Sequence, residues 1–298
     1  MPMSPTVPVP PPVSLGKSPL RVVPLAWGMW RFAGASVVDA TARVNAARDI
    51  GITLFDTADI YGFDGPGFGA AEELFGQVLA RSPGLRNGIV IATKGGILPP
   101  LPYDSGAAYL ERALDASLRR LGLDHVDLWQ VHRPDILTHP AALAESLARM
   151  VKSGKTRAVG VSNFTAAQVA ALQAHLPFPL ASIQPELSPW VTAPLRDGIL
   201  DQAMALGLGV LAWSPLGGGR ISAPGPVTDL LVAKARDSGV SVSAAAYAWI
   251  LAHPSRPIPI VGSQRPERIR EAAGTWRVEW SRQEWYELLQ ASMGERLP

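Results

Sequence analysis

Eight short apolar runs of strand type alternate with segments of helical spacing, and this alternation limits the fold more than any other feature. The runs are Arg21–Trp27, Ile52–Asp56, Ile89–Lys94, Val126–His132, Arg157–Val161, Ala181–Gln184, Gly209–Trp213 and Ile258–Val261. Several are apolar at successive positions, which is typical of parallel strands covered on both faces. Eight such units in one chain predict an α/β fold, a closed (β/α)8 TIM barrel.

An open, doubly wound sheet is the alternative that periodicity alone allows. Its dinucleotide-binding form would carry a G-x-G-x-x-G motif after the first strand, and this chain has none there. A β-hairpin is expected before the barrel, with Gly16-Lys17-Ser18 as its turn, and an extra helix after it. Helical spacing predicts helices over Val37–Ile50, Ala108–Leu121, Ala141–Lys152, Val227–Asp237, Val242–Ala252 and Arg282–Ala291.

The chain has 298 residues, of which 47% are hydrophobic, enough for one large core. Residues 1–14 are rich in Pro and Val, so we expect an extended or disordered arm before a single domain over residues 15–298. The start lacks the charged and apolar regions of a secretory signal, and no run is long enough to span a membrane. We therefore expect a cytoplasmic protein without a membrane partner.

Charge and residue types exclude several classes of function. The 27 basic and 25 acidic residues are scattered and give a net charge of +2, so nucleic acid is not an expected partner. The chain has no cysteine, which removes disulfides, Cys-ligated zinc and a Cys nucleophile. The histidines away from the strand ends show no metal-ligand spacing, so no metal is expected. These are His125, His139, His175 and His253.

Polar side chains stand at the carboxyl ends of three consecutive predicted strands. Asp56 ends the second, and Tyr61 follows in the next loop, while Lys94 and His132 end the third and fourth. In such barrels the chemistry lies at these strand ends and in the loops after them. Lys and His are rarely buried without partners, so their place at the ends of apolar strands indicates a site.

These four side chains fit one mechanism. A carbonyl that accepts hydride develops negative charge on oxygen and needs a proton donor. The pKa of a free tyrosine is about 10, and a neighbouring ammonium lowers it. Tyr61 would then donate the proton, Lys94 would tune it, and Asp56 would hold Lys94 charged. His132 would orient the substrate oxygen.

Six ordered motifs resemble those of the aldo-keto reductase family, and the resemblance extends from about residue 15 to residue 282. The motifs are Phe55–Gly62, Ala92–Lys94, Val131–Asp135, Gly160–Phe164, Trp213–Gly219 and Ile258–Ser263. The segment from Ala212 to Arg220 looks most like a bacterial branch of poorly characterised NADPH-dependent oxidoreductases. The resemblance implies reduction of an aldehyde or ketone to an alcohol, with NADPH as the cofactor.

Roles for individual residues follow from this resemblance. Asp56, Tyr61, Lys94 and His132 match the family's catalytic tetrad. Ser162, Asn163 and Gln184 match the groups that bind the nicotinamide carboxamide, and Trp213 matches the aromatic that stacks on the ring. The expected contacts to the rest of the cofactor are the first-strand loop and the segment along the pyrophosphate: Gly28, Met29, Trp30, Ser214, Pro215, Leu216, Gly217 and Gly219.

The segment after the last strand matches the family's site for the adenosine 2′-phosphate. Ser263, Arg265 and Arg268 are the expected phosphate ligands, and Glu271 is an expected adenosine contact. Two positions depart from the family pattern. Gly262 stands where many members have Lys, and Ala272 stands where many have Asn. The first departure leaves the phosphate to the two arginines.

Two other classes of function stay open. A Schiff-base aldolase would use Lys94 as the nucleophile, but it leaves Ser162, Asn163 and the segment after the last strand unexplained. A redox sensor or regulatory subunit would bind the nicotinamide cofactor with little turnover. The substrate loops, residues 95–104 and 220–227, combine Pro and Gly with apolar residues. We expect a moderately apolar carbonyl compound as the small-molecule partner.

Overall fold

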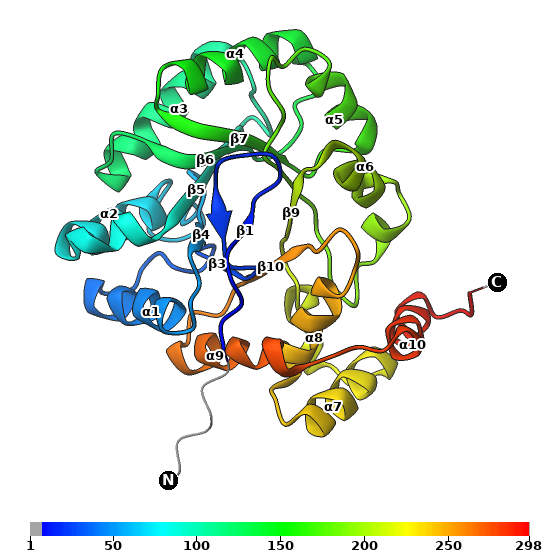
Figure 1. Cartoon of the computed structure of the whole chain (residues 1–298). Helices are drawn as coiled ribbons and strands as arrows, with labels where there is room; N and C mark the ends of the chain where they lie inside the picture. The colour runs from blue at the N-terminus through cyan, green and yellow to red at the C-terminus, as the bar shows by residue number, and fades with distance from the viewer. Residues whose placement is uncertain (1–7, 298) are drawn as a thin grey trace.

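The computed structural model describes residues 8–297 and contains a closed barrel of eight parallel strands. Figure 1 shows the strands as a ring with the helices outside it. The predicted fold class is therefore confirmed. The barrel strands are β3 (Ala26–Gly28), β4 (Leu54–Asp56), β5 (Val90–Gly95), β6 (Val126–Val131), β7 (Thr156–Ser162), β8 (Ser182–Gln184), β9 (Gly209–Ala212) and β10 (Ile258–Val261).

The barrel strands have one apolar face toward the barrel axis and another toward the helices. Leu54, Ala92 and Leu128 belong to the inner core, whereas Phe55, Ile91 and Trp129 belong to the larger core beneath the helices. Both faces are buried, which explains why these strands read as continuous apolar runs. The register places Asp56 beside Ala92 and Lys94 beside Gln130, so the polar strand ends meet at one end of the barrel.

Each of the six predicted helices is present, with ends within one or two residues of the prediction. Ser36 caps the first helix, and Gly122, in the left-handed conformation, ends the third. The helices are α1 (Val37–Asp49), α2 (Ala70–Arg81), α3 (Ala107–Leu121), α4 (Pro140–Lys152), α5 (Ala166–Gln173), α6 (Ile199–Leu206), α7 (Pro226–Ser238), α8 (Val242–Leu251), α9 (Pro266–Glu271) and α10 (Arg282–Met293). Two helices, α7 and α8, lie between the last two strands, and α10 is the extra helix expected after the barrel.

The predicted first strand, Arg21–Trp27, is two separate strands. β2 (Arg21–Val22) pairs with β1 (Val13–Ser14) in the hairpin, whereas β3 pairs with β4 and β10 in the barrel. Pro24 lies between them and has no N–H to donate, so it interrupts the ladder. Of the expected Pro-rich arm, residues 1–7 lie outside the described residues, and Val13–Ser14 form β1.

The hairpin closes the amino end of the barrel. Leu15, Leu20 and Val22 are buried in the same cluster as the inward side chains of the strands. Gly16 forms the turn with a φ of 58°, and a Cβ there would lie 2.5 Å from the carbonyl oxygen of Ala181. Only glycine allows this approach. In Figure 1 the hairpin lies across one mouth of the barrel, whereas the polar residues meet at the carboxyl ends of the strands.

The C-terminal tryptophans pack the last helices onto the barrel. The rings of Trp249 and Trp285 stack with centroids 4.8 Å apart, and each indole N–H donates to the other residue's carbonyl oxygen. Trp280 donates to the carbonyl oxygen of Ala245. These contacts join α8 and α10, so this group of aromatics is structural. Across residues 8–297, no helix combines the length and the apolar character needed to cross a membrane.

Candidate active site

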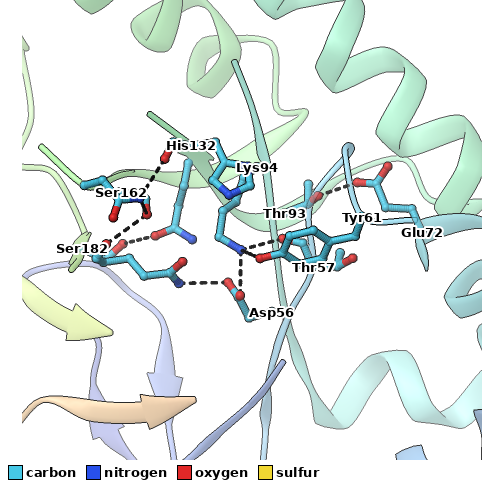
Figure 2. Close-up of polar contacts among 12 residues, drawn as sticks. Asp56, Thr57, Tyr61, Glu72, Thr93, Lys94, His132, Ser162 and Ser182 are labelled. Carbon is cyan, nitrogen blue, oxygen red and sulfur yellow. Dashed lines mark hydrogen bonds and ion pairs between the residues drawn. The ribbon is translucent and has the colours of Figure 1, made fainter. Parts of the chain in front are cut away.

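The structure brings the four polar side chains from the strand ends into one cluster (Figure 2). The Lys94 ammonium donates to a carboxylate oxygen of Asp56 at 2.7 Å and to the hydroxyl of Tyr61 at 3.3 Å. The rings of Tyr61 and His132 meet edge to face, with centroids 5.9 Å apart. Residues separated by up to 76 positions thus form one site at the carboxyl end of the barrel.

Lys94 is fully buried and uses all three of its donors. Besides Asp56 and Tyr61, it donates to the carbonyl oxygen of Thr57 at 2.8 Å. Burial by itself lowers the pKa of Lys94, but the Asp56 carboxylate and then Tyr61 outweigh it, so this pKa lies above its usual value. A Schiff-base nucleophile must be a neutral amine with a free lone pair. The geometry therefore argues against the aldolase alternative.

The Tyr61 loop is fixed by backbone hydrogen bonds on both sides. The N–H groups of Thr57 and Asp59 donate to the carbonyl oxygens of Ala92 and Lys94. The carbonyl oxygen of Tyr61 accepts from Ala71, the second residue of α2. These bonds tie the loop to β5 and to the next helix. The backbone that carries Tyr61 is therefore held in place by its neighbours in the chain.

The pKa of Tyr61 is raised, whereas the sequence predicts that Lys94 lowers it. Burial is the largest cause of the increase, and the Asp56 carboxylate adds to it, while Lys94 and Arg133 lower the pKa. The influence of Lys94 thus has the expected sign but is outweighed. Tyr61 consequently keeps its proton throughout the neutral range, which is the form that a proton donor needs.

His132 is held in its neutral form. Burial, then the charges of Lys94 and Arg133, hold its pKa well below the usual range. Its backbone N–H donates to the carbonyl oxygen of Gly95, and its own carbonyl oxygen accepts from the amide of Asn163. A neutral imidazole has one donor and one acceptor nitrogen. Nδ1 of His132 is buried and has no hydrogen-bond partner among the described residues.

Three amide and hydroxyl side chains lie at the ends of β7 and β8, beside this cluster. The Ser162 hydroxyl donates to the backbone carbonyl oxygen of Gln184 at 2.9 Å, and the side-chain amide of Asn163 donates to the Ser162 hydroxyl at 2.8 Å. The indole N–H of Trp213 donates to the side-chain oxygen of Asn163 at 2.9 Å. The four residues expected near the nicotinamide therefore form one hydrogen-bonded network.

Gln184 has a contact that the sequence does not predict. Its amide nitrogen donates to the second carboxylate oxygen of Asp56 at 3.1 Å. Asp56 is thus held between Lys94 and Gln184. The amide nitrogen has two hydrogens, so one donor remains for a further acceptor. Gln184 therefore links the predicted nicotinamide network to the predicted catalytic cluster.

The segment after β9 offers an open backbone surface. Gly217, Gly218 and Gly219 all have positive φ, and a Cβ at Gly219 would meet nothing within 4 Å. Asn163 and Ser214 also adopt positive φ, at 62° and 52°. Such backbone is unusual for residues other than glycine and gathers at binding sites. Pro215 and Gly217 are buried, and Leu216 is half-buried against the core.

The two arginines expected to bind phosphate after β10 differ in their ion pairing. Arg265 pairs with Glu267 at 2.6 Å, whereas Arg268 is exposed and makes no ion pair within residues 8–297. The Ser263 hydroxyl accepts from the backbone N–H of Arg265 at 3.3 Å. Glu271 is exposed, and the space beside Gly262 is open. Arg268 is thus the arginine of this segment that is available to an anion.

The loop after β3 contains both core and exposed residues. Met29 is fully buried in the hydrophobic core, and a Cβ at Gly28 would lie 2.7 Å from the side chain of Ile260. Both positions therefore serve packing. Trp30 is 65% exposed, with the Arg31 guanidinium over its ring. Trp27 is fully buried, and its indole N–H donates to the carbonyl oxygen of Ser263.

Arg133 joins the site, and sequence reasoning missed it. Its guanidinium lies 5.7 Å from the ring centroid of Trp213, and its charge lowers the pKa of both Tyr61 and His132. The signal was a charged residue directly after His132 at a strand end. Arg133 adds a second cation beside the predicted proton donor, and it is more accessible than Lys94.

Comparisons with known proteins agree with this geometry. The family model described as Aldo/keto reductase family matches residues 24–292. A 6-dehydroglucose reductase of Novosphingobium aromaticivorans is 54% identical over 98% of this chain and 99% of its own length. A 6-dehydroglucose reductase of Agrobacterium fabrum is 37% identical over 93% of this chain and 97% of its own length.

A search of solved structures also finds an aldo-keto reductase. A thermostable aldo-keto reductase in complex with the inhibitor epalrestat matches with a TM-score of 0.83 and 25% identity, over 94% of this chain and 99% of the other. The family match covers the whole barrel and every strand end described above. Carbonyl reduction is the chemistry of these relatives, and this chain is an oxidoreductase of the same kind. The chain belongs to the aldo-keto reductase family.

Proposed function

We propose that this protein reduces a sugar aldehyde to the alcohol with NADPH, and that Tyr61 donates the proton. The cluster of Lys94, Tyr61 and His132 supports the proposal most strongly, because it combines a buried cation, a protonated phenol and a neutral imidazole. The bound cofactor would supply the hydride. The protein groups would supply the proton and stabilise the charge on the carbonyl oxygen.

Each residue of the cluster has one task in this proposal. Tyr61 donates its hydroxyl proton to the carbonyl oxygen as negative charge develops there. Lys94, 3.3 Å from that hydroxyl, stabilises the phenolate left behind. Asp56 keeps Lys94 charged and in place, and His132 donates a hydrogen bond to the same carbonyl oxygen. None of these groups needs to change position for the proton to move.

The residues present fit a nicotinamide dinucleotide. The network of Ser162, Asn163 and Gln184 would hold the carboxamide, and Trp213 would cover the ring. The open backbone from Ser214 to Gly219 would lie along the pyrophosphate. Arg268, which makes no ion pair with another described residue, would meet the 2′-phosphate, with Ser263 beside it. Glu271 stays a predicted adenosine contact.

The names of the relatives suggest the substrate class. Both are 6-dehydroglucose reductases, and the closer of the two matches almost the whole chain. 6-Dehydroglucose is an aldehyde on a hydroxylated ring, whereas the loop composition alone favours a moderately apolar compound. Arg133 beside the cluster can donate hydrogen bonds to ring hydroxyls. The test is to offer the enzyme 6-dehydroglucose, simple aldehydes and ketones, and to measure the rate of reduction of each by the loss of NADPH absorbance. Preference for 6-dehydroglucose supports the assignment, and preference for apolar ketones contradicts it.

Arg268→Ala should weaken NADPH binding roughly tenfold to a hundredfold and change NADH binding less than about twofold. The reason is that Arg268 has no ion-pair partner among the described residues and NADH lacks the 2′-phosphate. Dissociation constants from tryptophan quenching would measure both. Arg265→Ala is the matched control and should have a smaller effect, because Arg265 already pairs with Glu267. Equal weakening of both cofactors by Arg268→Ala would contradict the phosphate assignment.

A further inference from the structure

Asp59 is a buried carboxyl group that the proposed mechanism does not use. It lies two residues before Tyr61 and is 1% exposed. Its backbone N–H donates to the carbonyl oxygen of Lys94. One of its carboxyl oxygens has no hydrogen-bond partner among the described residues, and the other lies 3.4 Å from the hydroxyl of Tyr109. An ionised carboxylate with so few donors is costly to bury.

Tyr109 connects this carboxyl to the loop after β5. The Tyr109 hydroxyl lies 3.2 Å from the carbonyl oxygen of Ile97, which belongs to that loop. A hydroxyl has one proton, so it cannot donate both to Ile97 and to Asp59. The carbonyl oxygen of Ile97 can only accept. Both contacts are satisfied when Asp59 is the donor to Tyr109 and Tyr109 is the donor to Ile97.

We propose that Asp59 and Tyr109 are positioning residues for the proposed reduction. A protonated Asp59 donates to Tyr109, which donates to Ile97, and this relay holds the substrate loop, residues 95–104, against the Tyr61 loop. The inference rests on the proposed function for its kinetic consequence. The relay itself is a property of the chain without substrate.

The charges around Asp59 support its neutral form. Burial and then the Glu72 carboxylate raise the pKa of Asp59 well above its usual value, and Arg120, the backbone N–H of Ile60 and the contact with Tyr109 only partly oppose them. Arg120 is already engaged, because it pairs with Glu72 at 2.6 Å, and Glu72 also accepts from Thr93. Glu72 is fully buried and therefore needs this arginine itself. Within residues 8–297, Asp59 is left without a cation of its own.

Two further hydrogen bonds hold the base of the substrate loop. The backbone N–H of Asp104 donates to the carbonyl oxygen of Gly96, and that of Ser105 donates to the side chain of Asp135. Between these points the loop carries Leu101 and Tyr103, which are 54% and 42% exposed. The loop follows directly on Lys94. A change in its position would alter the wall of the substrate site without moving the proton donor.

The experiment compares Asp59→Asn, Asp59→Leu, Tyr109→Phe and the double variant Asp59→Leu/Tyr109→Phe in the full chain. Asp59→Asn keeps a neutral donor and should leave kcat/KM within about threefold of wild type. KM for the carbonyl should rise roughly fivefold to tenfold in Asp59→Leu and in Tyr109→Phe. The double variant should raise KM no further than either single variant, because all three break the same relay. The kcat and the NADPH dissociation constant should change little.

Two measurements without substrate separate this inference from the proposed function. Hydrogen exchange at the non-proline amides of residues 97–104 should accelerate in Tyr109→Phe and Asp59→Leu but not in Asp59→Asn. The infrared carbonyl band of a protonated carboxylic acid should be present in wild type at neutral pH and lost in Asp59→Asn. Absence of that band, or unchanged exchange in Tyr109→Phe, would overturn the relay. Inactivity of wild type on every carbonyl with these two results intact would overturn only the proposed function.

Discussion

Tyr61→Phe is expected to lower kcat for carbonyl reduction by about a hundredfold to ten-thousandfold, the contribution of a positioned general acid. The phenol supplies the proton only as charge develops on the carbonyl oxygen, so its loss affects the chemical step. Tyr61 keeps its ring contact with His132 in the variant, and the loop is held by backbone bonds that the substitution does not touch. Single-turnover oxidation of bound NADPH measures this step directly.

The control for Tyr61→Phe is cofactor affinity and stability. The hydroxyl accepts a hydrogen bond from Lys94, which keeps its two other acceptors, Asp56 and Thr57. NADPH dissociation constants and the urea midpoint should therefore stay close to wild type. Turnover near the wild-type rate in this variant would show that another group donates the proton.

Lys94→Met is expected to lower the rate by about a hundredfold or more and to destabilise the fold by about 3–5 kcal/mol. The rate falls because the phenolate loses its neighbouring cation, which is also the main influence lowering the pKa of Tyr61. That pKa is already raised by burial and would rise further, so the protonated phenol becomes a poorer donor. Stability falls because Asp56, 3% exposed, loses its ion-pair partner.

The double variant Lys94→Met/Asp56→Asn separates the two effects. The neutral amide removes the unpaired buried charge, so the free energy of unfolding should recover in part. The rate should stay low, because the cation is still missing. Urea unfolding and single-turnover rates measure the two quantities. Recovery of activity together with stability would show that Lys94 has a structural role only.

The barrel could be predicted because its strands are buried on both faces and its helices have clear ends. The hairpin boundary could not be placed so well, because Arg21–Trp27 is apolar on both sides of Pro24 and reads as one run. Helical spacing does not single out α2, α5 and α6 in the sequence. Two of them, α5 and α6, have only eight residues each, too few for a strong periodic signal.

The members of the site could be predicted from strand ends, but their electrostatics could not. Lys94 beside a tyrosine suggests a lowered pKa, yet burial of Tyr61 reverses the net direction. Burial depends on what packs around the hydroxyl, which a linear motif does not contain. The bond from Gln184 to Asp56 joins residues 128 positions apart, and the contact of Arg133 with Trp213 depends on loop geometry. Arg268 and Arg265 look equivalent in sequence, and only Glu267 distinguishes them.

Transfer of deuterium from labelled NADPH to 6-dehydroglucose tests the central claim most directly. The cofactor would be prepared with deuterium in each of the two C4 positions in turn, and the sugar product analysed by mass spectrometry and NMR. One of the two labels should appear at the new alcohol carbon of the product, and Tyr61→Phe should slow this transfer by about a hundredfold or more while still binding NADPH. Tight NADPH binding by wild type with no label in any carbonyl product would contradict the reductase assignment and favour a regulatory role.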